Sequence, residues 1–358
     1  TPQTFSSSIQ QRHVNVYLGG GDNEIPNIGY DAAHHKLIQC GKGINGAQSN
    51  AYWGVNVSSV GDAGSDGYIT GTHRGYNFGD TTSHGWEYRP QVVYSPDNEM
   101  TAIFYGGSGT GKMRLIECTT TDVSSSSPNT YNVSSAHTFQ STADRAQYLS
   151  ACYHTGENKF VLAWADDDNN KGYIQTCTVT GTTSSASVSF GTAVEFRNSQ
   201  VKSIGMAFDS NTNKIYLTYW RSGNNLSMRY VTVSGTSISL GSESLITNNL
   251  DDGGACAYDP VNNKLVAMWW KSSANRAVAG TPGSSSVSWG SEQALQSGGS
   301  NGYKGQIIFE PKSGWFINSM LNNNRVYVQK VRLTSGNSGR TIETGGNSYT
   351  NSGVSEWG

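Results

Sequence analysis

Short apolar runs separated by clusters of Gly, Ser, Thr, Asn and Pro fill most of this 358-residue chain. Residues 231–271 show the pattern well, because apolar and polar positions partly alternate in VTVS, SISL and KLVAMWWK. Such alternation is typical of half-buried β-strands joined by turns, and no sustained helical period accompanies it. The pattern therefore predicts an all-β protein.

A seven-residue turn motif that begins with an aromatic residue recurs at intervals of roughly 50 to 65 residues, a spacing typical of repeat proteins. Its six copies are YDAAHHK at Tyr30, YSPDNEM at Tyr94, YHTGENK at Tyr153, FDSNTNK at Phe208, YDPVNNK at Tyr258 and FEPKSGW at Phe309. Around each copy we expect one strand before the turn (GACAY), a second after it (KLVAMWW) and a third (RVYVQKV). The fourth is nearly one phrase in three units, SVSFG at Ser187, SISLG at Ser237 and SVSWG at Ser286. Four antiparallel strands per unit, repeated six times, predict a six-bladed β-propeller.

The repeats account for the chain as a single propeller domain, residues 1–358. The expected units lie near residues 19–78, 86–139, 146–196, 201–246, 252–295 and 303–345, with residues 346–358 as a C-terminal tail. A closed ring needs a partner for the edge of its last blade. Residues 13–18 (HVNVYL) can complete the sixth blade beside residues 325–333, and residues 341–344 offer a competing outer strand. The sequence leaves both closures open.

Charge and cysteine content narrow the expected partners. The net charge of −2 predicts neither a nucleic acid nor an anionic membrane surface as a partner. No apolar run approaches the ~18 residues that a membrane-spanning helix needs, so we expect no membrane insertion. Five cysteines without a CxxC spacing argue against a disulfide framework or a zinc site and predict buried thiols. The chain begins with Thr1, which is consistent with removal or omission of a leader or a larger N-terminal part.

The loops of a propeller divide between two faces. Loops that lead from one blade to the next share one face, which we call the first face, with the loops between second and third strands. The recurring Asp209 and Asp259 belong to turns of the opposite, second face, where an Asp caps the turn and a following Asn or Gly takes the left-handed conformation. First-face loops differ between units, and variable loops on a rigid scaffold usually carry binding sites. We therefore expect the ligand site on the first face.

Aromatic side chains beside polar groups on this face suggest sugar recognition, since a ring can cover the apolar side of a sugar while polar groups bind its hydroxyls. Trp164, Tyr219 and Trp269 share one repeat position and are expected to pack between blades. Trp220 and Trp270 lie one step further along the chain, so we expect them to be exposed. The expected ligand-binding residues are Trp86, Tyr88, Arg89, Trp220, Arg221, Asp251, Asp252, Trp270, Lys271 and Tyr303.

Residues 71–91 gather the densest group of titratable side chains. The candidate catalytic residues among them are His73, Arg74, His84, Tyr88 and Arg89. Arginine could neutralise a uronate carboxylate while His or Tyr moves a proton, which suits β-elimination. The alternative is an elaborated surface loop with solvated charges, and the chain has no GxSxG, HExxH or GxxxxGK[ST] motif. Enzymatic activity stays open, with a non-enzymatic protein as the main expectation.

An acidic turn, ADDDNNKG, invites comparison with a calcium loop. Asp166, Asp168 and Asn170 supply oxygen ligands at alternating positions. Lys171 and Cys177 stand where such a loop needs Gly and Glu. We therefore expect a solvated turn and no cofactor, with calcium at these three residues as the alternative.

Three phrases, VSGTSISLGSE, AYDPVNNKLVAMWW and AFDSNTNKIYLTYW, resemble the tandem repeats of tail-fibre-like and other large structural proteins of marine bacteriophages, which also occur in secreted bacterial adhesins. The resemblance covers residues 94–333 and is strongest over residues 186–270. It implies an extracellular or virion setting and an attachment role, and no catalytic residues carry over. We therefore expect a lectin-like, receptor-binding module for cell-surface glycans, with virion or fibre proteins as further partners. The alternatives are a polysaccharide lyase or glycosidase, and a structural fibre component that contacts only protein.

Overall fold

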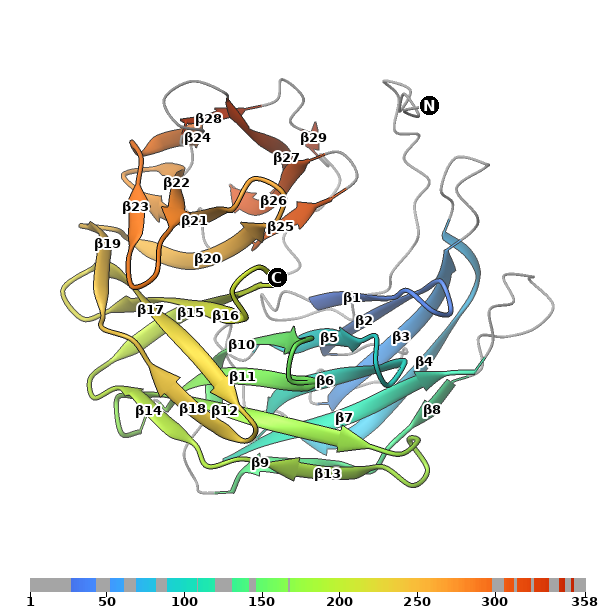
Figure 1. Cartoon of the computed structure of the whole chain (residues 1–358). Coiled ribbons are helices and arrows are strands. Elements are labelled where there is room, and N and C mark those ends of the chain that lie inside the picture. Colours follow the sequence, from blue (N-terminus) through green and yellow to red (C-terminus); the bar gives the residue numbers. More distant parts are fainter. Residues whose placement is uncertain are drawn as a thin grey trace.

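The computed structural model describes residues 27–42, 52–60, 69–81, 89–107, 109–119, 131–141, 146–166, 168–297, 306–311, 314–322, 325–334, 341–344 and 349–350. These residues form six antiparallel sheets arranged as the blades of a β-propeller (Figure 1), which confirms the predicted fold class. The described part of the chain has no helix, and so no helix that could span a membrane.

Each blade is built from consecutive strands, with the first strand of each sheet innermost in the ring. Blades 1 and 2 contain β1 (Asn27–Asp31), β2 (Lys36–Lys42), β3 (Tyr52–Val60) and β4 (Ile69–Thr81), then β5 (Gln91–Ser95), β6 (Met100–Gly107), β7 (Thr110–Cys118), β8 (Tyr131–Val133) and β9 (His137–Gln140). Blades 3 and 4 contain β10 (Ala146–His154), β11 (Lys159–Asp166), β12 (Lys171–Thr180), β13 (Ser187–Phe190) and β14 (Val194–Arg197), then β15 (Val201–Asp209), β16 (Lys214–Arg221), β17 (Asn225–Ser234), β18 (Ser237–Leu240) and β19 (Ser244–Asn248). Blades 5 and 6 contain β20 (Asp252–Asp259), β21 (Lys264–Lys271), β22 (Ala274–Pro282), β23 (Val287–Trp289) and β24 (Gln293–Ser297), then β25 (Gln306–Glu310), β26 (Trp315–Asn322), β27 (Arg325–Thr334), β28 (Thr341–Thr344) and β29 (Tyr349–Thr350).

The outer edge of blades 2 to 6 differs from the four-strand prediction, because the outermost strand is broken into two pieces. In blade 4, β18 and β19 both pair with β17, and a short segment between them leaves the ladder. The N–H of Gly241 still donates to the carbonyl of Tyr230 (2.8 Å) at the break. Glu243 follows two residues later, and its carboxylate accepts from Arg197 of blade 3 as well as from Tyr219 of its own blade.

The aromatic turns behave as predicted. The carboxylate of Asp209 accepts hydrogen bonds from the N–H groups of Asn211 (2.8 Å) and Thr212 (3.2 Å), and Asp259 caps its own turn in the same way. The residue that closes each turn has positive φ, and Asn213 (52°) is one example. Asn tolerates this left-handed conformation better than most residues do, which explains the recurring Asn of the motif.

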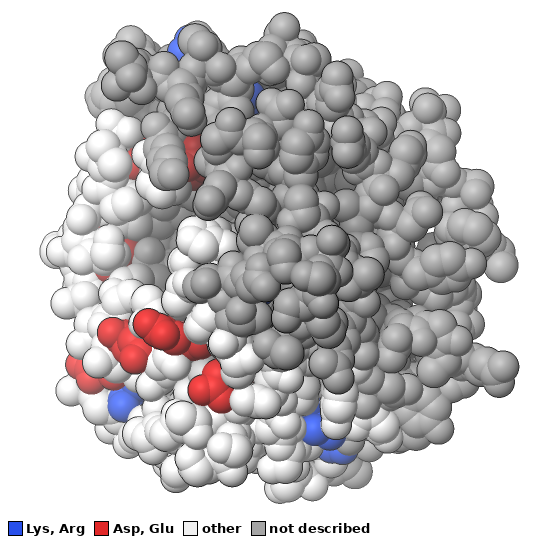
Figure 2. Space-filling view, turned by 90° about the vertical axis from the view of Figure 1, so that its right-hand side faces the viewer, with Lys and Arg blue, Asp and Glu red and all other residues white. Residues whose placement is uncertain are grey.

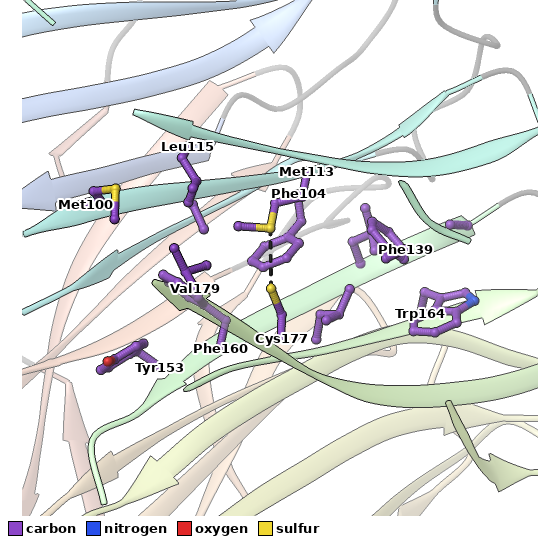
Figure 3. Close-up of a cluster of buried hydrophobic side chains, with 14 residues drawn as sticks. Met100, Phe104, Met113, Leu115, Phe139, Tyr153, Phe160, Trp164, Cys177 and Val179 are labelled. Atoms are coloured by element: carbon purple, nitrogen blue, oxygen red, sulfur yellow. Dashed lines mark hydrogen bonds between the residues drawn. The ribbon is translucent and has the colours of Figure 1, made fainter. Parts of the chain in front are cut away.

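The hydrophobic core is divided among the spaces between neighbouring blades. Between blades 2 and 3, Phe104 and Met113 face Phe160 and Cys177 (Figure 3). The Cys177 thiol lies 3.5 Å from the sulfur of Met113. Similar clusters fill the spaces between blades 3 and 4 and between blades 4 and 5. Burial of each such side chain contributes about 1.5–3 kcal/mol, so side-chain packing holds neighbouring blades together.

Two further predictions concern the cysteines and the ring closure. All five cysteines are free, and four of them are buried as the sequence predicts, whereas Cys152 is half-buried. Burial raises the thiol pKa of each cysteine, and that of Cys256 reaches about 12. In blade 6 the fourth strand is β28, so the structure has the arrangement with residues 341–344 as the outer strand. Residues 13–18 lie outside the described residues.

Candidate functional site

Acidic side chains gather on the second face of the ring. The first strands and third strands of blades 2 and 3 point toward the right-hand side of Figure 1, so their following turns form the second face there. Figure 2 views this side and shows acidic side chains gathered on it, with few basic ones among the described residues. The first face receives the ends of β14 and β16, which carry Arg197 and Arg221. Arg197 and Arg221 therefore lie at the first-face end of neighbouring blades.

Four successive blades bring polar side chains together at the first-face ends of their inner strands. Arg89 precedes β5, Tyr148 lies in β10, Ser203 in β15 and Asp252 at the start of β20. Ser203 Oγ donates to Asp252 Oδ1 (2.6 Å), which also accepts from the N–H of Gly253 (2.6 Å). Burial lowers the pKa of the Arg89 guanidinium to about 10, while the charge of Asp252 opposes the change. The predicted residues Arg89 and Asp252 thus belong to one electrostatic group.

The backbone is strained at this group of inner strands. Tyr148 and Ser203 have φ of 50° and 47°, and each follows the same bulge position in its strand. Positive φ is uncommon for residues other than Gly, Asn and Asp, and its cost is offset here by packing between blades. A Cβ on Gly205 would lie 2.2 Å from the carbonyl oxygen of Gly254, so two inner strands meet backbone to backbone. Equivalent bulges in consecutive blades indicate that this geometry is part of the fold.

A groove of about 440 Å³ lies between blades 3 and 4 at the first-face end. The residues that line it are Glu195, Phe196, Arg197, Asn198 and Arg229. The ring of Phe196 is buried and packs against Tyr219 of blade 4, with 5.0 Å between ring centroids. The absence of a side chain at Gly172 makes room for this ring, since an added Cβ would lie 2.4 Å from it. Phe196 and Gly172 therefore fix the end of β14 and place Arg197 against blade 4.

The carboxylate of Glu243 holds the arginines of this groove together. Arg197 Nη1 lies 2.8 Å from Glu243 Oε2, Arg221 Nε lies 3.0 Å from Oε1, and Arg229 Nη2 lies 3.9 Å from Oε2. Tyr219 also donates to Oε2 (2.7 Å). Burial favours the neutral acid, but the hydrogen bond from Tyr219 and the charges of Arg197 and Arg221 hold the pKa of Glu243 below its usual range. Glu243 is therefore ionised at neutral pH and joins two blades.

Blade 5 has a simpler version of the same pair. Glu292 stands at the position of Glu243, two residues after the Gly at the break in the outer strand. Its Oε1 accepts from Arg276 Nη1 (2.6 Å), and Lys271 Nζ lies 3.9 Å from Oε2. The predicted residues Arg221 and Lys271 thus end equivalent strands, and each contacts a carboxylate of its own blade.

The expectation that Trp220 and Trp270 are exposed is wrong, since their relative exposures are only 9% and 5%. Second strands are buried on both sides, because a neighbouring blade covers each face of the sheet, and β16 is buried at six successive positions. One step along such a strand therefore leads from one buried face to the other. The same packing buries Trp164, Tyr219 and Trp269, as predicted.

The remaining candidate residues are dispersed. Asp251 accepts from the N–H of Ser272 (2.8 Å) and so stabilises the turn between β21 and β22. His73 and Arg74 lie in β4, the outermost strand of blade 1, and not in a surface loop. The sheet of blade 1 therefore separates them from the inner strands beside which Arg89 lies. The candidates outside the described residues are His84, Trp86, Tyr88 and Tyr303.

The acidic turn after β11 is closed on itself. Asp166 is buried, and its two oxygens accept from the N–H (3.1 Å) and the side-chain amide (2.9 Å) of Asn169. Asp168 and Asn170 are exposed. Across the described ranges no group of three or more His, Cys, Asp or Glu side chains could hold a metal ion. Asp166 thus has the turn-capping role that Asp209 has in another turn.

Sequence reasoning did not single out Arg197, Arg229, Glu243, Tyr148 or Ser203. One signal was present, because the phrase GSE follows the fourth strand in blades 4 and 5 and places Glu243 and Glu292 at one repeat position. The contact of Arg197 with the next blade had no such signal, since it depends on how two blades pack.

No protein-family model matches this sequence, and neither does any curated protein. The fold does match solved structures. A periplasmic gluconolactonase of Pseudomonas aeruginosa has a TM-score of 0.58 and 11% identity over 90% of this chain and 84% of its own. AofleA from Arthrobotrys oligospora has a TM-score of 0.53 and 8% identity over 91% and 87% of the two chains, and a protein from Lactobacillus plantarum has 0.56 and 8% over 87% and 81%. At such low identity these similarities support the propeller fold alone.

Proposed function

We propose that this protein is a non-enzymatic recognition module that binds cell-surface glycans through the first face of its propeller. The observation that carries the proposal is the groove between blades 3 and 4, where Arg197 and Arg229 are held by Glu243 beside the buried ring of Phe196. Binding sites are typically concave, with a few polar groups held in fixed positions. Arginine is suited to sugars because its planar fork donates paired hydrogen bonds to neighbouring oxygens.

The arrangement suits binding better than catalysis. The candidate acid-base residues His73 and Arg74 lie on the outer strand of blade 1, away from this groove. Proton transfer needs groups within hydrogen-bond reach of one reacting atom. We further propose an extracellular or virion setting, as in a tail fibre or a secreted adhesin, where a rigid propeller would present its first face to a cell surface.

A glycan array probed with the labelled protein tests this function. We expect the wild type to retain a defined set of glycans, and we expect Arg221→Ala to reduce retention because Arg221 orients the carboxylate of Glu243. Lys159→Ala is the matched control, since Lys159 hydrogen-bonds Thr178 near the second face and should leave retention unchanged. Failure to retain any glycan, or release of products with new ultraviolet-absorbing unsaturated ends, would overturn the proposal.

A further inference from the structure

The groove between blades 3 and 4 has no acceptor to spare on Glu243. Its Oε2 accepts from Arg197 (2.8 Å) and Tyr219 (2.7 Å), and its Oε1 accepts from Ser227 Oγ (3.3 Å). Arg221 Nε donates to Ser227 Oγ (2.9 Å) and lies 3.0 Å from Oε1. A carboxylate offers about four lone-pair positions, so these three donors and the adjacent guanidinium of Arg221 occupy it. Glu243 therefore positions the arginines and is closed to the hydroxyl groups of a ligand.

Donors remain available on the arginines. Arg229 donates through Nη1 to the carbonyl of Gly241 (2.7 Å), while its buried Nε has no hydrogen-bond partner in the described part of the chain. The Nη groups of Arg221, and one Nη of Arg197, donate to no residue within the described ranges. The Arg229 Nε is enclosed by protein, so the donors that a ligand can reach are on the partly exposed guanidinium groups of Arg197 and Arg221.

The charges at the groove are also unequal. Three arginines surround the single carboxylate of Glu243. Glu195, which lines the groove beside Arg197 and Arg229, lies 2.8 Å from Lys171, and the charge of Lys171 offsets its own. The groove therefore combines an excess of positive charge with an excess of donors, and both features favour an anion rich in acceptors.

We propose that the groove binds the carboxylate of an acidic sugar residue, such as a uronate or a sialate, at the arginines that Glu243 holds, with Arg197 and Arg221 as the donors. This inference rests on the proposed glycan-binding function and specifies its ligand. A guanidinium matches a carboxylate with two parallel hydrogen bonds, which a neutral hydroxyl pair accepts more weakly. The buried ring of Phe196 packs against Tyr219 and fixes the position of the adjacent Arg197 at the groove.

Titration calorimetry of the whole chain with two matched pairs of probes tests the inference. The pairs are trigalacturonate with its methyl ester, and sialyllactose with lactose. We expect one acidic probe to bind at least about tenfold more tightly than its neutral partner, because hydrogen bonds to charged groups are stronger than neutral ones. This preference should shrink when the salt concentration rises from about 50 mM to about 500 mM.

Variants then locate the site. Arg197→Gln should remove the preference for the acidic probe, while Lys159→Gln near the second face should keep it. Glu243→Gln should weaken acidic binding less than Arg197→Gln does, because it removes a carboxylate that competes with the ligand but also loosens the arginines that this carboxylate positions. Tighter binding of neutral glycans on the array, or acidic binding that Arg197→Gln leaves intact, would refute the acidic-sugar site while glycan binding itself stands. Failure of every glycan to bind would refute the proposed function as well.

Discussion

Replacement of Glu243 by Gln is the most informative perturbation of stability, because this one carboxylate joins blades 3 and 4. Gln keeps one acceptor oxygen and turns an N–H donor toward the groups that the other oxygen served. Hydrogen bonds to charged groups contribute about 1.5–3 kcal/mol each, and Glu243 is only 18% exposed. Its arginine partners are about a quarter exposed, which screens part of the effect. We therefore expect the free energy of unfolding to fall by about 2–3 kcal/mol.

Differential scanning calorimetry measures the change, and blade 5 supplies the control. The unfolding entropy of a 358-residue chain is about 0.75 kcal/mol per kelvin, so Tm should fall by about 3–4 °C in Glu243→Gln. Glu292→Gln removes one close partner, Arg276 at 2.6 Å, and one distant one, Lys271 at 3.9 Å. It should cost less than about 1 kcal/mol and shift Tm by about 1 °C.

The pH dependence gives an independent check. Because the folded protein holds the pKa of Glu243 below its ordinary value of about 4.3, the carboxylate stabilises the fold above that pH. This stabilisation is lost as the pH falls toward the lower pKa of the folded state. The difference in Tm between wild type and Glu243→Gln should therefore be complete at neutral pH and shrink below about pH 4. Equal shifts for Glu243→Gln and Glu292→Gln, or a difference that does not change with pH, would refute the reasoning.

Three further predictions concern the scaffold. Asp209→Ala should lower the free energy of unfolding by about 3 kcal/mol, because it removes a turn cap and the acceptor for the buried hydroxyl of Tyr216. Asp259→Ala removes a turn cap whose hydrogen bonds are to Asn262 and the turn backbone, so it should cost about half as much. Denaturant titration would show this order, and a reversed order would contradict it. Gly205→Ala should lower the free energy of unfolding by more than about 2 kcal/mol, because its Cβ would meet a neighbouring backbone. Gly235→Ala has open space around the new Cβ but a φ of 60°, so it should lower the free energy of unfolding by about 1 kcal/mol. Equal changes for the two variants in urea titration would argue against the close approach of the inner strands. The five cysteines should react with a thiol reagent at pH 8 only after unfolding, because burial raises the pKa of their thiols. Rapid labelling of the native protein, or fewer than five reactive thiols after denaturation, would count against this.

The sequence alone determined the fold because its information is local and repeated. In three of the aromatic turns an Asp caps the hairpin, and the last residue of every turn has positive φ, which Asn213 supplies in the turn of Asp209. Six such units with four expected strands each leave few architectures other than a ring of blades. The packing of Trp164, Tyr219 and Trp269 followed from the same repeat position. The breaks in the outer strands were missed, although the recurring GSE phrase marks two of them.

Only the tertiary structure decided which side chains meet. Burial of Trp220 and Trp270 depends on a neighbouring blade covering each face of a sheet, which alternation along one strand cannot reveal. Arg221 was expected from the sequence as a ligand-binding residue, but its partner Glu243 follows 22 positions later, and Arg197 comes from another blade. Contacts between blades are fixed by the geometry of the ring and not by the spacing of residues in the chain. For that reason the sequence predicted the scaffold and the face, and the structure was needed to assemble the arginine groove.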